Sequence, residues 1–386
     1  MKLDPRNPEH VLVAARALGV SACALVGRVL TRRRRWIIFF GHRLTGNLLS
    51  FFEALRDHPA YQPVFVDLDK GYVDELRRQG YRCAWLGGPD AIRVLRAAAA
   101  VVSSHGPQVL EPFMRLTRMP CIDVWHGIPY KGWHPSEFRS LRRYDRFLVS
   151  SPDLARMHVE MYGFRQDQVV ATGYGRVDDL VRHTRTDVEE AKAAIGLGPD
   201  VPLVLFAPTW AQDDPNRSFI PFGAPSDEFF GRLVSVAESF GARLALRAHL
   251  NAPADIGQGD TVVALPFADY PETERVLLAT DILICDWSSI AFDFLVLDRP
   301  TIFLDVPPPF REGFTLGPEF RFGEVVGDLD ELEAALQRYL ATPGAYVEEH
   351  RESIEMARRV AYGELADGYA SERYVSVLEE LLATRR

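Results

Sequence analysis

A histidine at the end of an expected β-strand is the first residue of this sequence that could carry chemistry. His126 follows the apolar run Cys121–Trp125, Gly127 comes next, and Lys131 lies five residues after the histidine. A histidine in this place suits proton abstraction, and a glycine lets the backbone approach a ligand closely. Lys131 suits an anionic substrate. The alternative is that His126 only hydrogen-bonds its own loop and Lys131 is solvated, because a short motif is a weak signal.

A second candidate lies where the apolar strand Ile282–Cys285 leads into the helical run Ile290–Leu297. Asp286, Ser288 and Ser289 occupy this junction. A strand that ends in two serines and opens a helix presents backbone amides, two hydroxyls and a favourable dipole to an anion, which predicts phosphate binding. The alternative is a plain helix N-cap by Ser288 or Asp286.

Two more expected strands end in polar residues of the same kind. Thr209 and Trp210 follow one apolar run, and Arg247 and His249 follow another. Thr209 could donate to a phosphate or a ribose, Trp210 could stack on a base, and the two basic residues could neutralise a pyrophosphate. Each signal alone is weak, because a lone histidine or tryptophan is more often structural. The convergence of three such strand ends in one half of the chain favours a phosphate site.

The elements that must position these residues are short, continuously apolar runs separated by helix-like stretches, a pattern typical of parallel strands buried on both faces. The first series of expected strands is Trp36–Phe40, Pro63–Leu68, Arg82–Leu86, Ala99–Ser103, Cys121–Trp125, Arg146–Val149 and Val169–Thr172. The second series is Leu203–Phe206, Leu244–Leu246, Val262–Leu265, Ile282–Cys285 and Thr301–Leu304. Helices are expected over Asp227–Ser239, Leu329–Leu340, Ala345–Val360 and Ser371–Leu382, and a long polar loop over Asn216–Pro225.

This pattern predicts an α/β protein with two doubly wound, Rossmann-like domains. A chain of 386 residues exceeds what one hydrophobic core usually supports. We expect an N-terminal helical segment over residues 1–35, a first domain over residues 36–185, and a second domain over residues 186–386 with closing helices. Open parallel sheets bind ligands at the carboxyl ends of their strands, so a ligand is expected between the two domains.

Composition narrows the class of protein. The chain has 47% hydrophobic and 25% charged residues and a formal net charge of -9. The first two values are those of folded proteins, and the acidic balance disfavours nucleic acid as a partner. Its four cysteines show no CxxC pair or disulfide-like spacing, which predicts a reducing, cytoplasmic location.

The N-terminal run Val11–Leu30 is apolar apart from Arg16, Arg28 and small polar residues, and four arginines at positions 32–35 follow it. The basic run lies after the apolar stretch, which argues against a signal peptide. The segment is marginal as a membrane span, so an interfacial or packed helix is expected. Basic residues beside such a helix favour the anionic inner face of the membrane, whereas the plain alternative is a solvated run before the first strand.

Taken together, these residues resemble the CDP-glycerol glycerophosphotransferase family of teichoic-acid and capsule synthesis. Residues 126–131, HGIPYK, are similar to the family's HGTPLK, and residues 172–179, TGYGRVDD, to its TGYPRNDxL. Residues 207–210, APTW, resemble APTWR, residues 285–293, CDWSSIAFD, resemble TDYSSxxFD, and Arg299-Pro300 falls where the family has KKP. The sequence departs from the family at Ala211, which replaces an arginine, and at Gly175, which replaces a proline.

The resemblance implies a GT-B architecture with the CDP-donor in the C-terminal domain and the acceptor in the N-terminal one. It implies transfer of a polyol phosphate to a hydroxyl of a polyprenyl-linked or cell-surface glycan, with release of CMP. His126 and His249 are the expected catalytic residues. The expected substrate-binding residues are Gly127, Lys131, Arg176, Thr209, Trp210, Arg247, Asp286, Ser288 and Ser289.

No cofactor or metal is expected, because Asp286 and Asp293 do not form a convincing cation site. Two other functions stay open. A GT-B enzyme could instead transfer or epimerise the sugar of a nucleotide sugar, since one architecture hosts many chemistries. The departures at Ala211 and Gly175 also leave open an inactive nucleotide-binding scaffold.

Overall fold

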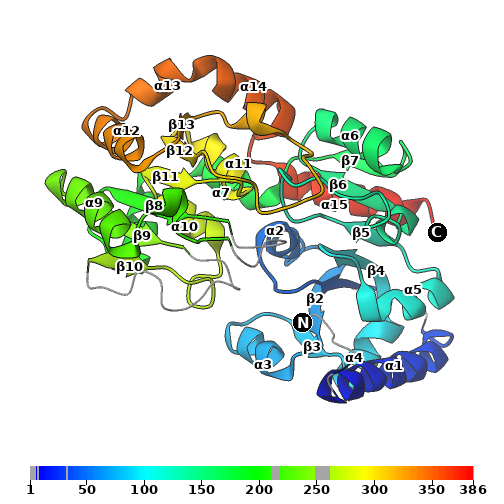
Figure 1. Ribbon diagram of the computed structural model, residues 1–386. Helices are drawn as coiled ribbons and strands as arrows, with labels where there is room; N and C mark the ends of the chain where they lie inside the picture. Colours follow the sequence, from blue (N-terminus) through cyan, green and yellow to red (C-terminus); the bar gives the residue numbers. More distant parts are fainter. Residues whose placement is uncertain (1–5, 7, 32–33, 210–216, 248–260, 386) are drawn as a thin grey trace. The chain divides into compact units, whose positions relative to one another are not determined.

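The computed structural model describes the chain except residues 1–5, 7, 32–33, 210–216, 248–260 and 386. The chain divides into two compact units (Figure 1). Unit 1 comprises Met1–His126, Pro135–Arg176 and Tyr369–Arg386, and unit 2 comprises Gly127–His134 and Val177–Gly368. The units differ from the expected domains in three places: Gly127–His134 groups with unit 2, unit 2 resumes at Val177 instead of residue 186, and the C-terminal helix groups with unit 1.

Within its described residues, unit 1 is built on one parallel sheet of seven strands in the order β3-β2-β1-β4-β5-β6-β7. Its strands are β1 Trp36–Phe40, β2 Gln62–Asp67, β3 Cys83–Trp85, β4 Ala98–Ser103, β5 Cys121–Asp123, β6 Arg146–Val149 and β7 Val169–Ala171. Every pairing is parallel. The strand order reverses between β1 and β4, and this is the switch point at which doubly wound sheets bind ligands.

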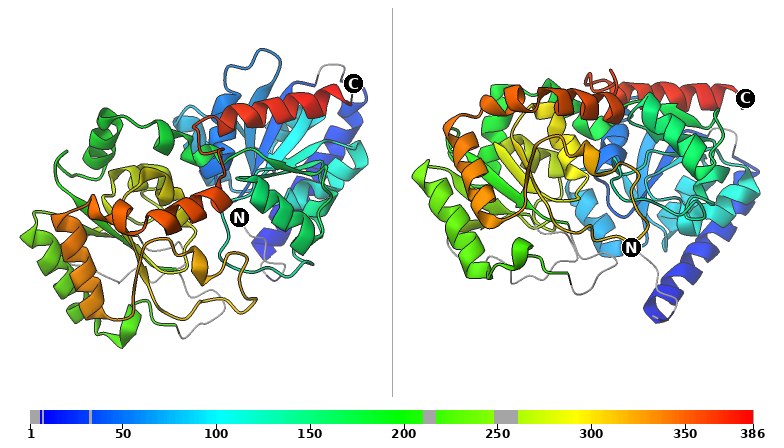
Figure 2. Two further views of the ribbon diagram at one scale, coloured as in Figure 1. Left: turned by 90° about the horizontal axis from the view of Figure 1, so that it is seen from above. Right: turned by 45° about the horizontal axis from the view of Figure 1, so that its top comes forward.

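Helices cover the sheet of unit 1. They are α1 Pro8–Arg28, α2 Gly46–Ala54, α3 Lys70–Arg78, α4 Pro89–Arg96, α5 Glu111–Thr117, α6 Pro152–Tyr162 and α15 Ala370–Ala383. The C-terminal helix α15, red in Figures 1 and 2, packs against α2. Tyr374 of α15 joins the buried core of unit 1 and lies 5.3 Å from the ring of Phe51 in α2. The end of the chain therefore returns to complete the first core.

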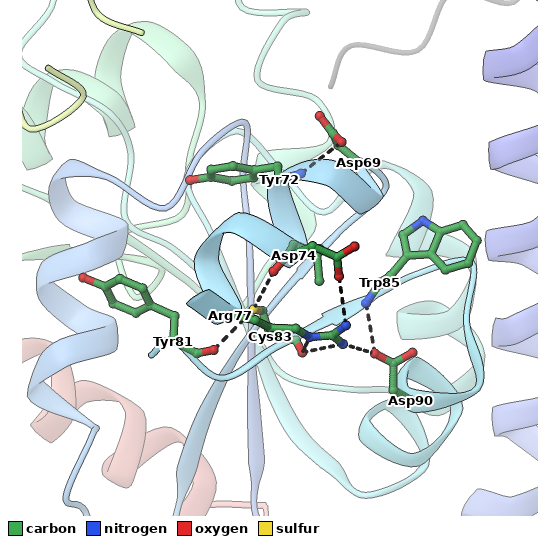
Figure 3. A network of polar contacts seen from close by, with 9 residues as sticks. Asp69, Tyr72, Asp74, Arg77, Tyr81, Cys83, Trp85 and Asp90 are labelled. Atoms are coloured by element: carbon green, nitrogen blue, oxygen red, sulfur yellow. Dashed lines mark hydrogen bonds and ion pairs between the residues drawn. The ribbon is translucent and has the colours of Figure 1, made fainter. Parts of the chain in front are cut away.

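Side chains of unit 1 fix the start of α3 and hold β3 at the sheet edge. Asp69 accepts a hydrogen bond from the amide of Tyr72 and so caps α3, the usual role of aspartate at a helix start. At the sheet edge, Arg77 of α3 donates to the carbonyl of Cys83 and pairs with Asp90 (Figure 3). This network fastens β3 to the helices on either side of it.

Helix α1 packs along α4 and α5. Arg28 at its end is buried, and its guanidinium donates to the carbonyls of Leu95 and Ala98 at 3.2 and 2.8 Å. Burial lowers the pKa of Arg28 to about 10. Among the described residues, Val11–Arg28 is the one helical stretch long and apolar enough to cross a membrane by length and composition. Its packed side and the buried Arg28 support the packed alternative of the expected helix.

Within the described residues, unit 2 is built on a parallel sheet of six strands in the order β10-β9-β8-β11-β12-β13. Its strands are β8 Leu203–Ala207, β9 Arg243–Leu246, β10 Val262–Ala264, β11 Ile282–Cys285, β12 Thr301–Leu304 and β13 Glu324–Val326. The switch point lies between β8 and β11. Strand β13 was not predicted, because it has only three residues, of which Val325 is exposed and another is a glutamate.

The helices of unit 2 are α7 Asp178–Arg182, α8 Arg185–Ala194, α9 Ser226–Ser239, α10 Thr273–Ala279, α11 Ile290–Phe294, α12 Leu329–Ala341, α13 Ala345–Glu349 and α14 Arg351–Ala361. The single helix expected over Ala345–Val360 is wrong in one respect: it is interrupted at His350, where the backbone leaves the helical region. Two doubly wound parallel sheets confirm the predicted fold class.

Candidate active site

Three histidines follow neighbouring strands of unit 1. His42 comes after β1, His105 after β4 and His126 after β5, and these strands are adjacent in the sheet. The rings of His105 and His126 stack with centroids 4.2 Å apart and planes 13° apart, and His42 lies 4.5 Å from His105. The histidine predicted from the sequence therefore lies beside the switch point in a cluster of imidazoles.

The hydrogen bonds of His126 define which ring nitrogen can act as a base. Nδ1 lies 3.2 Å from the carbonyl oxygen of Ser104. A carbonyl only accepts, so Nδ1 carries the proton and Nε2 keeps the lone pair. Arg176 donates to the carbonyl oxygen of His126 at 2.9 Å, which brings two of the predicted site residues together.

The residue before His126 is held in an unusual backbone conformation. Trp125 has φ of 50°, a genuine outlier for a bulky residue. Its amide donates to Asp123 at 2.9 Å, and its carbonyl accepts a 3.4 Å hydrogen bond from Asn47. The other side of the Asn47 amide accepts from the backbone of Arg176 at 3.2 Å. The buried Asn47 thus ties the strained turn to Arg176, and such strain is typical of functional sites.

Burial sets the protonation of this cluster. It lowers the pKa of His126 to about 4, with smaller lowering effects from Arg176 and His42. Burial also lowers the pKa of His105 well below its ordinary value, and His126 and His42 lower it further. His126 and His105 are therefore neutral near pH 7. Burial raises the pKa of Asp123 to about 6, but this carboxylate is occupied by Ser103 and by the amides of Gly106 and Trp125.

In unit 2, a polar group spans the switch point between β8 and β11. Asp286 follows β11, is 2% exposed, and accepts from the amide and the hydroxyl of Thr209, which follows β8. It also accepts from the amide of Trp287 at 2.7 Å and pairs with Arg217. Asp286 therefore does not cap the following helix. Its two oxygens are both occupied by protein donors.

A pocket of about 260 Å³ opens at these strand ends. Its polar lining consists of Thr209, Arg217, Ser218 and Asp286. The rest of the lining is mainly apolar: Pro208, Phe219, Ile220, Pro221, Phe222, Gly223, Leu304, Val306, Pro307 and Pro308. A concave, mostly apolar site with a few convergent polar groups is typical of a small-molecule site. The part of the expected polar loop from residue 217 onward is thus a pocket wall rather than solvated chain.

The serine pair departs from expectation in one respect. Helix α11 begins at Ile290 and is five residues long, followed by a 3-10 turn over Leu295–Leu297. So short a helix offers only a small dipole. Ser289 makes no capping hydrogen bond, and the Ser288 hydroxyl lies 3.5 Å from the amide of Ile290. At this junction, the hydroxyls of Ser288 and Ser289 could bind a phosphate, and the helix dipole of α11 adds little.

The residues after His126 belong to unit 2. Gly127 has φ of 149°, and Lys131 pairs by an antiparallel bridge with Phe314. The ring of Tyr130 is buried and lies 5.7 Å from Trp287 at the end of β11. Lys131 is therefore held by the unit that carries the serine pair, although the sequence places it next to the base.

Three predicted residues do not gain support. Arg247 donates to the carbonyls of Leu265 and Tyr270 and to the hydroxyl of Thr273, so its guanidinium holds a loop rather than facing the pocket at Asp286. His249 and Trp210 lie outside the described residues.

Metal-ligand spacing occurs elsewhere in the part of the chain that the structure describes. Glu324, Glu349 and His350 place their ligand atoms within 4.8 Å of one another. Arg338 already pairs with both carboxylates, at 2.7 and 3.5 Å. The group is better explained as an ion-pair network of unit 2.

Sequence reasoning missed His42, His105, Asn47 and Arg217. The first two each stand two residues after a predicted strand, so the signal that identified His126 was also available for them. Arg217 lies inside the expected loop Asn216–Pro225, and Asn47 lies inside a helix, so neither carried a local signal.

Comparisons with known proteins show which protein family the chain matches. Residues 26–380 match the family described as CDP-Glycerol:Poly(glycerophosphate) glycerophosphotransferase. The chain is 26% identical over 370 residues to the teichoic acid glycerol-phosphate transferase of Staphylococcus aureus, covering 87% of this chain and 90% of that relative. It is 25% identical over 330 residues to the teichoic acid poly(glycerol phosphate) polymerase of Bacillus spizizenii, covering 76% and 80%.

Among solved structures, a variant of the wall teichoic acid polymerase TagF aligns with a TM-score of 0.76 at 17% identity. The alignment covers 98% of this chain and 96% of that chain, and it shows a common fold. The family match spans most of the sequence and includes the His126, Thr209 and Asp286 segments. The chain therefore belongs to the CDP-glycerol:poly(glycerophosphate) glycerophosphotransferase family.

Proposed function

We propose that this glycerophosphotransferase moves glycerol phosphate, or a related polyol phosphate, from its CDP-activated donor to a hydroxyl of a lipid-linked glycan and releases CMP. The observation that carries the residue assignment is the placement of polar groups at the two switch points. Unit 1 presents the neutral imidazole of His126, and unit 2 presents Thr209, Asp286 and Arg217 around a pocket. Ligands of doubly wound sheets bind at such points.

In the proposed reaction, Nε2 of His126 takes the proton of the acceptor hydroxyl. The hydroxyl oxygen attacks the β-phosphorus of the donor in line, and the bond between this phosphorus and the bridging oxygen breaks. CMP leaves with that bond's electron pair, and the proton on His126 passes to solvent. A positioned base contributes about 100- to 10,000-fold to such a step.

Positioning and charge provide most of the catalysis in phosphoryl transfer. We assign the donor diphosphate to Thr209, Arg217, Ser288 and Ser289, with Lys131 as a further positive charge of unit 2. Asp286 orients the first two through the hydrogen bonds and ion pair described above. A charge-assisted pair of this kind holds a planar guanidinium in one orientation.

Four other residues keep proposed roles. Arg176 is partly exposed beside His126 and is proposed to contact a phosphate of the substrate. Gly127 is proposed to let the backbone approach the substrate. His249 remains a predicted catalytic residue, and Trp210 remains a predicted donor contact. No cofactor is required by this proposal.

We further propose that α1 rests on the inner face of the cytoplasmic membrane. Val26, Val29 and Leu30 are 76%, 87% and 85% exposed, and Arg34 and Arg35 follow as exposed cations. Apolar side chains beside basic ones suit an anionic lipid surface, where each cation contributes about 1 kcal/mol. Such a location would give the enzyme access to a lipid-linked acceptor.

The reaction is tested by incubating the full chain with a panel of CDP-alcohols and nucleotide sugars plus a lipid-like acceptor analogue. The released nucleotide is identified by mass spectrometry. CMP release from CDP-glycerol that is lost in His126→Ala supports the proposal. Release of a nucleoside diphosphate from a sugar nucleotide would move the function to glycosyl transfer, and tight nucleotide binding without turnover would indicate a scaffold.

The membrane proposal is tested by flotation with vesicles of phosphatidylglycerol and phosphatidylcholine. We expect Val26→Asp with Leu30→Asp to reduce the bound fraction, with the turnover of a soluble acceptor analogue unchanged. Binding equal to the wild type would contradict the proposal. A matched control is Leu116→Asp, which alters a 72% exposed leucine of α5.

A further inference from the structure

The histidine cluster of unit 1 contains more than a candidate base. Its middle ring, His105, lies between an exposed ring, His42, and the ring of His126. The contact with His126 is nearly parallel, at 4.2 Å and 13°, whereas the contact with His42 is tilted by 55°. The face of the His105 ring therefore stacks on the ring of His126, whereas its contact with His42 is tilted.

A hydrogen bond from Nδ1 to the Ser104 carbonyl, at 3.2 Å, selects the orientation of the His126 ring. Rotating the ring about its Cβ–Cγ bond would carry Nδ1 off this carbonyl and turn the lone pair of Nε2 away from the position where the proposed reaction needs it. A single neutral hydrogen bond favours one arrangement by only about 2- to 13-fold. A stacked aromatic pair adds a factor of similar size, about 2- to 13-fold.

Ser104 couples the two rings. Its carbonyl accepts from His126, and its hydroxyl lies 3.0 Å from Nδ1 of His105. The serine is 7% exposed, and a Cβ at Gly41 would come within 2.7 Å of its hydroxyl oxygen. Only a glycine at the end of β1 leaves room for this arrangement. The backbone thus holds both histidines at defined positions above the sheet.

We infer that His105 is a positioning residue for this reaction: its ring stacks on His126 and holds Nε2 of His126 in the orientation that accepts the proton of the acceptor hydroxyl. This inference rests on the proposed function, in which His126 is the base. Because His105 is neutral, its ring face also remains compatible with the imidazolium that forms when His126 takes the proton. A second cation in that place would repel it.

Two substitutions separate ring stacking from the contact with Ser104. His105→Phe keeps an aromatic ring and loses the nitrogen near Ser104, whereas His105→Leu loses both the ring and the nitrogen. Both retain a side chain of similar volume, which limits damage to the fold. His58→Leu is the matched control, because His58 also stacks on a ring of unit 1, that of Tyr61 at 5.3 Å and 22°.

The experiment measures kcat and the donor KM from CMP release, together with ¹⁵N spectra of the His126 imidazole. We expect His105→Phe within about threefold of the wild-type kcat, and His105→Leu lower by about 10-fold with the donor KM unchanged. The His126 spectrum should show the Nδ1–H form in the wild type and in His105→Phe, and a mixture in His105→Leu. His58→Leu should leave kcat unchanged.

Four results would overturn the inference. They are wild-type kcat in both variants, an equal loss in both, a change confined to KM, or a loss of kcat with an unchanged His126 spectrum. An equal loss would assign the effect to the Ser104 contact. Undiminished activity of His126→Ala would instead refute the proposed base, so the two failures are distinguishable. Circular dichroism and thermal unfolding confirm that each variant is folded.

Discussion

The protonation of His126 leads to a prediction about the pH dependence of the reaction. Burial lowers its pKa from 6.5 to about 4, so the neutral base persists in mildly acidic solution. At pH 5.0, a base with a pKa of about 4 is roughly 90% neutral, whereas one at 6.5 is roughly 3% neutral, a difference of about 30-fold in active enzyme. We therefore expect kcat/KM for the free enzyme to be nearly constant from pH 8 down to pH 5.

The assay follows CMP release between pH 4.5 and 8.5, and each sample is returned to pH 7.5 to show that activity recovers. His126→Ala should reduce kcat by about 100- to 10,000-fold at every pH. Its donor affinity should stay near normal, because the proposed donor contacts Thr209 and Arg217 belong to unit 2. His183→Ala provides a control outside the site. A half-maximal rate near pH 6.5 would refute the lowered pKa of His126. Wild-type turnover of His126→Ala would refute the assignment of His126 as the base.

Two other predictions concern buried charges. Arg217→Ala leaves the carboxylate of Asp286 buried without its partner, so we expect a loss of about 3 to 5 kcal/mol in the free energy of unfolding and at least about a 10-fold higher donor KM. Adding Asp286→Asn should restore stability in urea titrations but not donor affinity; recovery of both would show that Arg217 is only a counter-ion. His158 is 1% exposed, and burial lowers its pKa to about 4. As the pH falls below 6.5, the unfolded chain therefore takes up a proton at His158 before the folded protein does. The contribution of His158 to the free energy of unfolding should therefore fall by up to about 3 kcal/mol from pH 6.5 to 4 and stay level above pH 6.5. Urea titrations at pH 7.5 and 5.0 measure this change, and His158→Phe should remove the part of it that His158 causes.

Much of the fold was predictable because the strands are buried on both faces. Continuous apolar runs such as Trp36–Phe40 and Ile282–Cys285 can be read without knowing their partners, and both match the observed strands. Strand β13 lacks that signal, since its exposed and charged residues resemble a loop. The break at His350 was hidden as well, because both flanking segments have helical periodicity.

The site was less predictable than the fold, because its geometry depends on the order of strands across each sheet. His126 was identified by its own strand end, and the same local signal marks His42 and His105, each two residues after a strand. What the sequence does not show is that β1, β4 and β5 are neighbours, which is what brings the three rings together. Arg217 could not be found from its surroundings at all, since its partner Asp286 lies 69 residues away.

The two switch points differ in charge, and the difference fits the two halves of a phosphotransfer. In unit 1 the ring stacked on the proposed base is that of the neutral His105, and Arg176 donates to the carbonyl of His126. This leaves Nε2 uncharged and able to take a proton. In unit 2 the buried Asp286 pairs with Arg217 at the pocket, which would present a fixed guanidinium to the proposed anionic donor. A protonated histidine in place of the neutral His126 could not take a proton, and a neutral side chain in place of Arg217 could not offset the charge of a phosphate.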